Sequence, residues 1–532
     1  MKRFINVNFF IFIILSISFF LVIIQNPSDS AIEARTKVSA SEQRSNPNII
    51  FIMADDLGWN DVGYNNADVK TPNLDQLFKT GVVLDRFYVK NVCSVTRAAL
   101  MTGRHPFRFG MSQSIVEAWD KTGLPLSEMT IADSLKENGY FTAMVGKWHL
   151  GAYQESFLPM NRGFDYHYGN YHGSLDYFKH TVYGGLDWHR NGEVIREKGY
   201  TTDLIGKEAV NIINNHKFDN PLFLYVSFTA PHAPLQAKQE DIDSFENIKD
   251  EGRKIYLAQL KSMDEQIGKI IKVLKDRNIY DNTILFFTSD NGAATHLART
   301  RGDNRPLKGQ KATLYEGGLR VPTAFSYPKR FKQHQVVKEP FSIVDIYPTF
   351  TNFSGIPMTN SSLDGINIFD AIEKGFKREQ LLLQFKDSKT AAIILEDYKL
   401  VLNGMDNYMV PYYGTKELFN LYKDPNENFN LSESDPERVQ EMESILATFS
   451  KQAHSSDILE GSGTIPKGFK FPDVWTPKRL QEINSESESI LKGFSDFIFN
   501  IRRRYLVFIS FLLGFLVSLI IFYLRRSLSG NL

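Results

Sequence analysis

Cysteine is almost absent from this sequence: a single one, Cys93, stands in a chain of 532 residues. A lone cysteine has no partner within its own chain, which excludes a fold held together by internal disulfides. It can then be a leftover buried thiol, one half of a bridge to another chain, or a residue retained for its chemistry.

An excess of charge of either sign is also lacking, because 61 lysines and arginines balance 61 aspartates and glutamates. Without a strong overall field, nothing favours nucleic acid as a partner, or a polyanion spread over the whole surface. Any anion that the protein binds must therefore be recognised by a local cluster of side chains.

Long apolar runs are confined to the two ends of the chain. Phe4–Ile24 follows a basic start, so residues 1–25 are predicted to be a cleaved signal peptide or an uncleaved signal anchor. The polar residues 26–46 would form a linker. Tyr505–Leu524 is flanked by arginines and, at about 1.5 Å per residue, can cross about 30 Å of hydrocarbon. It predicts a transmembrane helix at 505–524, followed by a tail over 525–532.

Three Asn-x-Ser sequons, at Asn352, Asn360 and Asn430, are compatible with a lumenal or extracellular domain. Together with the terminal runs they predict a protein of the secretory pathway, anchored in a lipid membrane by its C-terminal helix. The main domain would face the lumen of the lysosome, endoplasmic reticulum or Golgi, or the extracellular space.

The chain is 42% hydrophobic and 23% charged, which suits a globular body with a substantial core. Continuous apolar runs are typical of strands buried on both faces of a sheet, and four of them are Asn48–Met53, Phe141–Val145, Leu222–Phe228 and Thr283–Thr288. Amphipathic helices are predicted between them, the longest over Arg253–Arg277. This alternation predicts an α/β fold, with a large, mostly parallel mixed sheet sandwiched by helices.

Further along the chain the pattern changes to shorter alternating segments, such as Ala391–Leu395 and Tyr398–Leu402. We therefore expect the main domain to span 47–374 and a smaller C-terminal α+β subdomain to span 375–475. A polar spacer over 476–504 would lead to the membrane helix.

Oxygen-rich pairs follow two of the predicted strands, Asp55-Asp56 after the first and Asp290-Asn291 after the last. Ligands of open α/β sheets gather beyond the carboxyl ends of the strands. Four hard oxygen donors converging there would suit Ca²⁺ or Mg²⁺. The alternative is that the pairs are helix caps and turn formers.

The segment from Cys93 to Gly103 predicts a helix that starts at the cysteine and stops at the glycine. Cys93 and Arg97 then lie one turn apart on the same face. A nucleophile, a guanidinium and a helix N-terminus directed at one point would fit a tetrahedral oxyanion.

Cations and proton carriers follow two other predicted strands. Lys147 and His149 come after Phe141–Val145, and His232 comes after Leu222–Phe228. Their place at strand ends makes these histidines candidates for chemistry. His105, His180 and His296 are interpreted as ordinary surface residues.

The motifs as a set resemble those of type I sulfatases, a family with an alkaline-phosphatase-like fold, and most of all those of arylsulfatase B and its relatives. The resemblance covers roughly residues 47–431, and its blocks occur in the expected order. They are Ala54–Tyr64, Cys93–Arg97 with Leu100–Arg104, Gly146–Gly151, Ser289–Gly292, Lys311–Gly318, Val344–Thr349 and Glu417–Leu421.

The resemblance implies a calcium-dependent enzyme. Cys93 would be oxidised to formylglycine in the endoplasmic reticulum, with the formylglycine-generating enzyme as a maturation partner. One Ca²⁺ per chain would be held by Asp55, Asp56, Asp290, Asn291 and the modified Cys93.

The resemblance also implies roles for the side chains around this centre. Arg97 and His149 would orient and activate the formylglycine hydrate. Lys147 and Lys311 would grip the sulfate oxygens, and His232 with Lys311 would assist the departing alcohol. The implied function is hydrolysis of sulfate monoesters in a sulfated carbohydrate resembling N-acetylgalactosamine 4-sulfate, or in an aryl sulfate.

Two alternatives remain open. Val95 stands where the family pattern Cys-x-Pro-x-Arg has proline, and Thr96 stands fourth, where serine is frequent. Because stiff valine replaces a residue that fixes φ, one alternative is a catalytically impaired, membrane-tethered protein that binds sulfated glycans. The other is a phosphate or phosphonate ester hydrolase on the related fold.

Overall fold

The computed structural model describes residues 46–112, 115–295, 301–354, 363–387, 389–407, 410–411, 415–454, 465 and 469–483. The predicted signal segment, most of the linker and the predicted membrane helix lie outside these residues. Within the described ranges, no helix is both long and apolar enough to span a bilayer.

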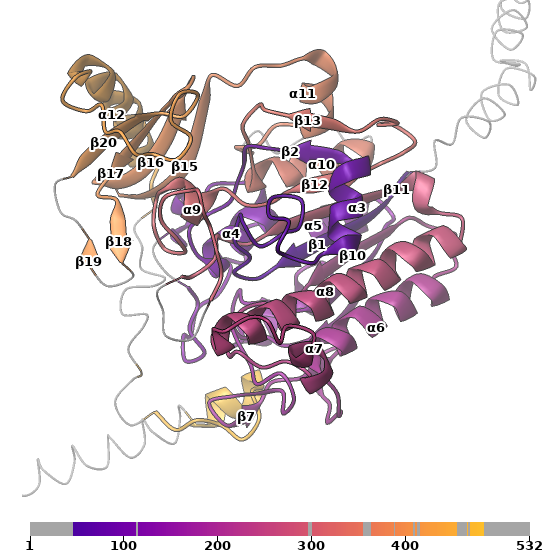
Figure 1. Cartoon of the computed structure of the whole chain (residues 1–532). Coiled ribbons are helices and arrows are strands. Elements are labelled where there is room, and N and C mark those ends of the chain that lie inside the picture. Colours follow the sequence, from indigo (N-terminus) through magenta and orange to yellow (C-terminus); the bar gives the residue numbers. More distant parts are fainter. Residues whose placement is uncertain are drawn as a thin grey trace, which may run out of the picture. The chain divides into compact units, whose positions relative to one another are not determined.

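A ten-stranded mixed sheet forms the centre of the main domain (Figure 1). Its strands, in spatial order, are β13 (Gln335–Val337), β2 (Val82–Leu84), β12 (Ala324–Ser326), β11 (Thr283–Ser289), β1 (Asn48–Ala54), β10 (Leu222–Ser227), β4 (Phe141–Gly146), β5 (Tyr166–Gly169), β8 (His189–Arg190) and β9 (Glu193–Val194). The five strands from β11 to β5 are parallel to one another. The four predicted buried strands are the four central ones, which confirms the predicted fold class.

The parallel register brings the carboxyl ends of the central strands level with one another. Ala54 at the end of β1 pairs with Ser289 at the end of β11, and Met53 pairs with Ser227 of β10. Ser227 in turn lies opposite Gly146 of β4. Residues that follow these strands therefore emerge side by side at one edge of the sheet.

Successive residues of a strand point to opposite faces of the sheet. Because the central strands carry apolar residues on both sides, both faces are apolar, and helices cover both. Ile50 and Ile52 of β1 join one apolar cluster and Phe51 joins the other. The first cluster is covered by α3 (Pro72–Thr80), α6 (Thr201–Asn215) and α8 (Glu251–Asp276), and the second by α4 (Cys93–Thr102), α5 (Ile131–Glu137), α10 (Ile346–Thr351) and α11 (Ile368–Lys374). Figure 1 shows α6 and α8 running side by side. The predicted helix over Arg253–Arg277 corresponds to α8.

A second, antiparallel sheet forms the C-terminal subdomain. Its strands are β15 (Gln380–Asp387), β16 (Thr390–Leu395), β17 (Tyr398–Leu402) and β20 (Lys416–Asn420). One face packs against α12 (Pro436–Ser450), and the other packs against Tyr88, Leu314 and Leu319 of the main domain. A smaller α+β region is therefore present, whereas its limits at 375 and 475 remain a prediction.

Shorter elements complete the described part of the chain. They are β3 (Phe87–Tyr88), β6 (Thr181–Val182), β7 (Gly185–Leu186), α7 (Gln239–Asp243), α9 (Glu316–Leu319), β14 (Phe341–Ser342), β18 (Met405–Asn407) and β19 (Val410–Pro411).

Residues 469–483 return from the subdomain to the main domain. Val474 forms a bridge with Leu186 of β7, and the Trp475 indole donates a hydrogen bond of 2.8 Å to the Val182 carbonyl. Trp475 is fully buried, in one apolar cluster with Trp119. The end of the predicted subdomain thus packs against the loops around β6 and β7.

Candidate active site

The oxygen-rich pairs after β1 and β11 lie together at the carboxyl edge of the sheet. Asp55, Asp56, Asp290 and Asn291 are all buried. The Asp56 N–H donates to Asp290 Oδ1 at 3.2 Å, and Asn291 Nδ2 donates to Asp56 Oδ1 at 2.6 Å. Asn291 Oδ1 is buried without a hydrogen-bond partner among the described residues. These pairs therefore converge instead of merely capping separate helices.

The helix α4 places Cys93 and Arg97 beside these carboxylates. Cys93 is its first residue, and Gly103 ends it with a left-handed φ of 64°. Cys93 Sγ lies 3.5 Å from Asp55 Oδ1. One turn later, the buried Arg97 guanidinium donates to Asp290 Oδ2 at 2.8 Å and to Ser227 Oγ at 2.6 Å. The predicted common face of Cys93 and Arg97 is directed at the acidic cluster.

Two lysines reach the same cluster from separate loops. Lys147, after β4, places its Nζ 2.5 Å from Asp55 Oδ2. Lys311 places its Nζ 2.6 Å from Asp56 Oδ1 and 3.2 Å from Cys93 Sγ. Each carboxylate after β1 thus has its own ammonium partner, and position 93 lies next to one of them.

Both predicted histidines are also present. His149 has a left-handed φ of 59°, and its ring lies so close to Gly173 that a Cβ there would come within 2.5 Å of Nε2. Its buried Nδ1 has no hydrogen-bond partner among the described residues. His232 Nε2 lies 3.6 Å from Asp56 Oδ2, and His232 Nδ1 donates to the Ala233 carbonyl at 2.7 Å.

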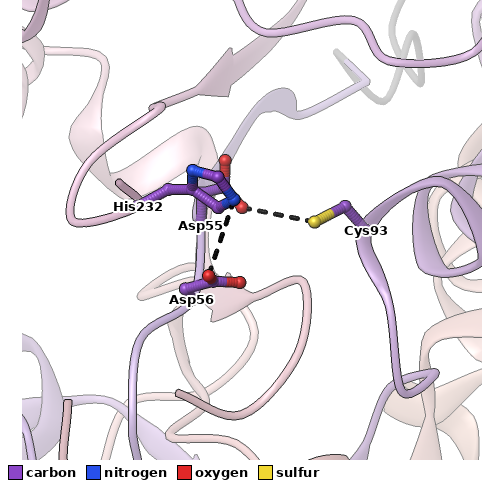
Figure 2. A group of neighbouring side chains, drawn as sticks. All are labelled: Asp55, Asp56, Cys93 and His232. Atoms are coloured by element: carbon purple, nitrogen blue, oxygen red, sulfur yellow. Dashed lines mark hydrogen bonds and ion pairs between the residues drawn. The ribbon is translucent and has the colours of Figure 1, made fainter. Parts of the chain in front are cut away.

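One group of possible metal ligands is found in this centre. Figure 2 shows Cys93 pointing from its helix toward Asp55, Asp56 and His232, and one ligand atom from each of the four lies within 4.8 Å of all the others. The unpartnered Asn291 oxygen adds a hard donor beside the carboxylates. Such oxygen donors are the ligands that Ca²⁺ prefers. The residues present therefore fit a divalent cation.

The electrostatics of the cluster also favour a cation. Burial and the neighbouring Asp290 raise the pKa of Asp55. Burial alone would raise the pKa of Asp56 too, but Lys311 and His232 outweigh it and lower that pKa. Burial would also raise the pKa of Asp290, but Arg97 and Lys147 outweigh this effect and lower it. Positive charge among these carboxylates offsets their mutual repulsion.

The same environment weakens Cys93 as a thiol. Burial and the charge of Asp290 raise its pKa to about 12, so the thiol stays protonated at neutral pH. Because the thiolate is the nucleophilic form, unmodified Cys93 is a poor nucleophile here. Burial, Lys147 and Arg97 lower the pKa of His149, and burial lowers that of His232 despite the two nearby aspartates. Both imidazoles are therefore neutral at neutral pH.

A cavity of about 210 Å³ opens above this centre. Cys93, His149, His232 and Lys311 line its inner end. Its other walls come from residues 115–118, from 172–174 after β5, and from 182–183. A small anion attached to a larger group could reach Cys93 through this cavity.

Sequence reasoning missed part of this lining. His172 and Glu117 face the cavity but were not singled out. His172 comes shortly after β5, and the signal that identified His149 and His232, a histidine beyond a buried strand, would have found it. The interpretation of His105 and His180 as surface residues is wrong, because both are buried against the packed core. His296 lies outside the described residues.

Comparisons with known proteins agree with this geometry. A family model described as Sulfatase matches residues 47–356. Arylsulfatase J of Mus musculus is 36% identical over 342 residues, which make up 63% of this chain and 57% of that protein, so less than two thirds of that relative is spanned. N-acetylgalactosamine-6-sulfatase of Homo sapiens is 32% identical over 385 residues, or 68% of this chain and 72% of that protein.

Solved structures show the same fold. Ps i-CgsB, in complex with k-i-k-neocarrahexaose, superposes with a TM-score of 0.70 at 34% identity, covering 78% of this chain and 94% of that one. A phosphonate monoester hydrolase of Agrobacterium radiobacter, at 20% identity and a TM-score of 0.54, shares the fold alone. The family match covers more than half of the chain, and the human relative exceeds 30% identity over two thirds of it. The protein therefore belongs to the sulfatase family of enzymes.

Proposed function

We propose that the protein hydrolyses sulfate monoesters of a sulfated carbohydrate resembling N-acetylgalactosamine 4-sulfate. The observation that carries this proposal is the place of Cys93, 3.2 Å from Lys311 and 3.5 Å from Asp55, at the inner end of a cavity. A relative named N-acetylgalactosamine-6-sulfatase and a similar structure in complex with k-i-k-neocarrahexaose support a sulfated sugar as the substrate class.

The cations around Cys93 supply the binding energy for the sulfate group. Lys147 and Lys311 end beside the carboxylates, and their ammonium groups can turn to the sulfate oxygens when a cation takes the carboxylates. Arg97 is held by Asp290 and Ser227, so it positions the start of α4 from behind. Preorganised cations of this kind stabilise negative charge that develops during transfer of the sulfate group.

Asp55, Asp56, Asp290 and Asn291 would hold Ca²⁺, together with the residue at position 93. When present, Ca²⁺ neutralises charge on the sulfate group, and formylglycine made from Cys93 provides as its hydrate the hydroxyl nucleophile that the thiol lacks. A neutral His149 can accept a proton beside position 93, and His232 with Lys311, which line the same cavity, would assist the departing alcohol.

The proposal includes the route of the protein through the cell. A signal at 1–25 would bring the chain into the secretory pathway, where the formylglycine-generating enzyme could act on Cys93. The run at 505–524 would then tether the enzyme to a lipid membrane, with its active site in the lumen or outside the cell.

The test measures release of 4-nitrophenol from 4-nitrophenyl sulfate by the purified full-length protein, with and without calcium. Turnover should be lost in Cys93→Ala and after removal of calcium by a chelator. Lys147→Met should lower kcat/KM by about 100-fold or more, because a preorganised donor is worth about 3 kcal/mol. No turnover by calcium-loaded protein with aldehyde at position 93 would refute the proposal.

Val95 favours a second candidate, a membrane-tethered protein that binds sulfated glycans without turnover. Proline is replaced at the position that the maturing enzyme would meet, so conversion of Cys93 could fail. Mass spectrometry of the tryptic peptide 91–97 separates the two candidates. Carbamidomethylation by iodoacetamide marks a surviving thiol, and an aldehyde in most molecules removes the support for this second candidate.

A further inference from the structure

One wall of the cavity carries a histidine that the proposed chemistry does not use. His172 is buried, with 5% of its surface exposed, and lies on the loop that follows β5. Its ring lines the cavity next to Gly173, the residue against which His149 packs. Its Nε2 is buried without a hydrogen-bond partner among the described residues. A polar atom of this kind costs free energy unless a ligand satisfies it.

The ring of His172 is held in place from behind by Asp187. The backbone N–H groups of Tyr171 and of His172 donate to this carboxylate, at 3.1 and 2.9 Å. His172 Nδ1 lies 2.9 Å from Asp187 Oδ2, and His189 Nε2 lies 3.0 Å from Asp187 Oδ1. Trp475 packs against the ring of His172 at a centroid distance of 4.5 Å.

This arrangement defines the tautomer of His172. Burial would raise the pKa of Asp187, but His172 and His189 outweigh this effect and lower it. Asp187 is therefore ionised and can only accept hydrogen bonds. The Nδ1 atom of His172 must then donate, which leaves Nε2, without a partner among the described residues, on the side of the cavity. In the neutral tautomer that this hydrogen bond selects, Nε2 is an acceptor. The chain thus presents a fixed hydrogen-bond acceptor to whatever group is attached to the sulfate.

The charges on this wall select a neutral partner. Apart from Lys311 at the sulfate end, the charged side chain among the described lining residues is Glu117. Glu117 lines the same wall, and burial and Asp120 raise its pKa. Two acceptors without a cation disfavour a second sulfate or a carboxylate and favour hydroxyl donors.

The size and rim of the cavity agree with a sugar ring. Its volume of about 210 Å³ is below the range of about 300–1,000 Å³ typical for drug-sized ligands, which suits a single ring. Tyr183 lies at the cavity with 51% of its surface exposed, and its ring stacks on that of Phe471 at 4.9 Å. An exposed aromatic face can pack against the apolar C–H face of a sugar.

We propose that His172, positioned by Asp187, is a specificity-determining residue that accepts a hydrogen bond from a free hydroxyl of the sugar that carries the sulfate. The preferred substrates are then sugars with a single sulfate and an unsubstituted neighbouring hydroxyl. This proposal rests on the proposed sulfatase function and adds the identity of the group beside the ester.

The experiment compares two substrate types on full-length protein that carries the aldehyde. One is 4-nitrophenyl sulfate, which has no sugar hydroxyl, and the other is the best of a panel of monosulfated galactose, N-acetylgalactosamine and N-acetylglucosamine. His172→Ala should lower kcat/KM for the sugar by about tenfold or more relative to the aryl sulfate, chiefly through KM. His172→Gln, which can return an acceptor, should recover part of the loss.

A matched control is His180→Asn, which alters a buried histidine that does not line the cavity and whose φ of 56° suits asparagine. Its ratio of sugar to aryl turnover should equal that of the unchanged protein. Equal losses on both substrates in His172→Ala would overturn the proposal, as would turnover of the aryl sulfate with none of the sugars. Turnover of neither substrate by the unchanged protein would instead refute the sulfatase function itself.

Discussion

Arg97 shows how much of the site depends on a single buried side chain. Its guanidinium joins three elements, because it donates to Asp290 after β11, to Ser227 of β10 and to the Lys147 carbonyl after β4. The side chain is fully buried. Burial alone would lower its pKa, but Tyr225 and Asp290 outweigh this effect and raise the pKa. The arginine is therefore charged and fixed, and removal of it would leave Asp290 without its fork of donors.

Arg97→Leu should lower the free energy of unfolding by about 3–5 kcal/mol, because it breaks a buried ion pair from one side. Urea denaturation followed by circular dichroism measures this change. Arg305→Leu is the matched control, since it breaks the exposed pair with Asp303 and should cost less than about 1 kcal/mol. Equal effects of the two substitutions would contradict the structural role given to Arg97.

Val95→Pro tests the link between the sequence at position 95 and maturation. Val95 is the third residue of α4, where N–H groups have no acceptor within the helix and proline is tolerated. We expect a larger fraction of aldehyde at position 93, measured by mass spectrometry of peptide 91–97. Val95→Ala removes the branched side chain without fixing φ, and an equal gain in that variant would argue against the effect of proline.

Element packing brings the loop of Lys311 to the proposed metal ligands. Gly292, directly after Asn291, donates its N–H to the Gly318 carbonyl at 3.1 Å. A Cβ at position 292 would lie 1.8 Å from the Gly317 carbonyl oxygen at the start of α9. The Lys311 N–H donates to the Ala293 carbonyl at 3.1 Å. The loop after β11 and the loop before α9 therefore lie in direct backbone contact.

Gly292→Ala should force these loops apart, with a loss of about 1–3 kcal/mol in the free energy of unfolding. Turnover of 4-nitrophenyl sulfate should fall by about tenfold or more, because Lys311 moves from position 93. Gly252→Ala is the control, since its added Cβ meets the flexible side chain of Arg301. Unchanged kinetics in Gly292→Ala would show that the contact does not position Lys311.

Predictions from sequence succeeded where the signal was local. The apolar runs became β1, β4, β10 and β11, and the cysteine-to-glycine segment became α4, because burial on both faces and a glycine stop leave clear patterns. The convergence of the residues after these strands followed from parallel topology. The close approach of Gly292 to Gly317 could not be predicted. It depends on how two separate segments of the chain pack against each other, and neither segment shows this in its own sequence.

At the scale of the molecule, a buried charge network joins the main domain to the C-terminal sheet. Lys399 of β17 lies 3.0 Å from Glu316 of α9 and 2.8 Å from Glu427. The Glu316 N–H also donates to Glu427 at 2.7 Å. Burial raises the pKa of Glu427 to about 7; Glu316 adds to this shift and Lys399 opposes it.

Glu427 therefore makes stability depend on pH. Its pKa in the folded state, about 7, exceeds the ordinary value of 4.5, so its stabilising contribution is complete below about pH 4.5 and is lost as the pH rises through about 7. Glu427→Gln should remove this dependence. The variant should gain up to about 3 kcal/mol relative to the unchanged protein between pH 4.5 and 8, measured by urea denaturation. The exposed Glu433→Gln should show no such difference, and a flat profile for both would contradict the buried network.

Sequence reasoning did not foresee this network or the course of residues 469–483. Glu316, Lys399 and Glu427 are separated by long stretches of chain, and no spacing between them announces a contact. Trp475 is the last residue of the predicted subdomain, and its polar neighbours in the sequence give no sign that it is buried against the main domain. Pairing of distant segments is a property of the folded chain and leaves little trace in local composition.

The burial of Trp475 against His172 has a consequence for biosynthesis. Residues up to Trp475 must be synthesised before the cavity wall behind His172 is complete. A nascent chain that ends earlier therefore carries the acidic centre without the support that we propose for sugar selectivity. Proteolytic removal of the residues after 454 would likewise weaken the proposed recognition of sugars and leave the acidic cluster in place.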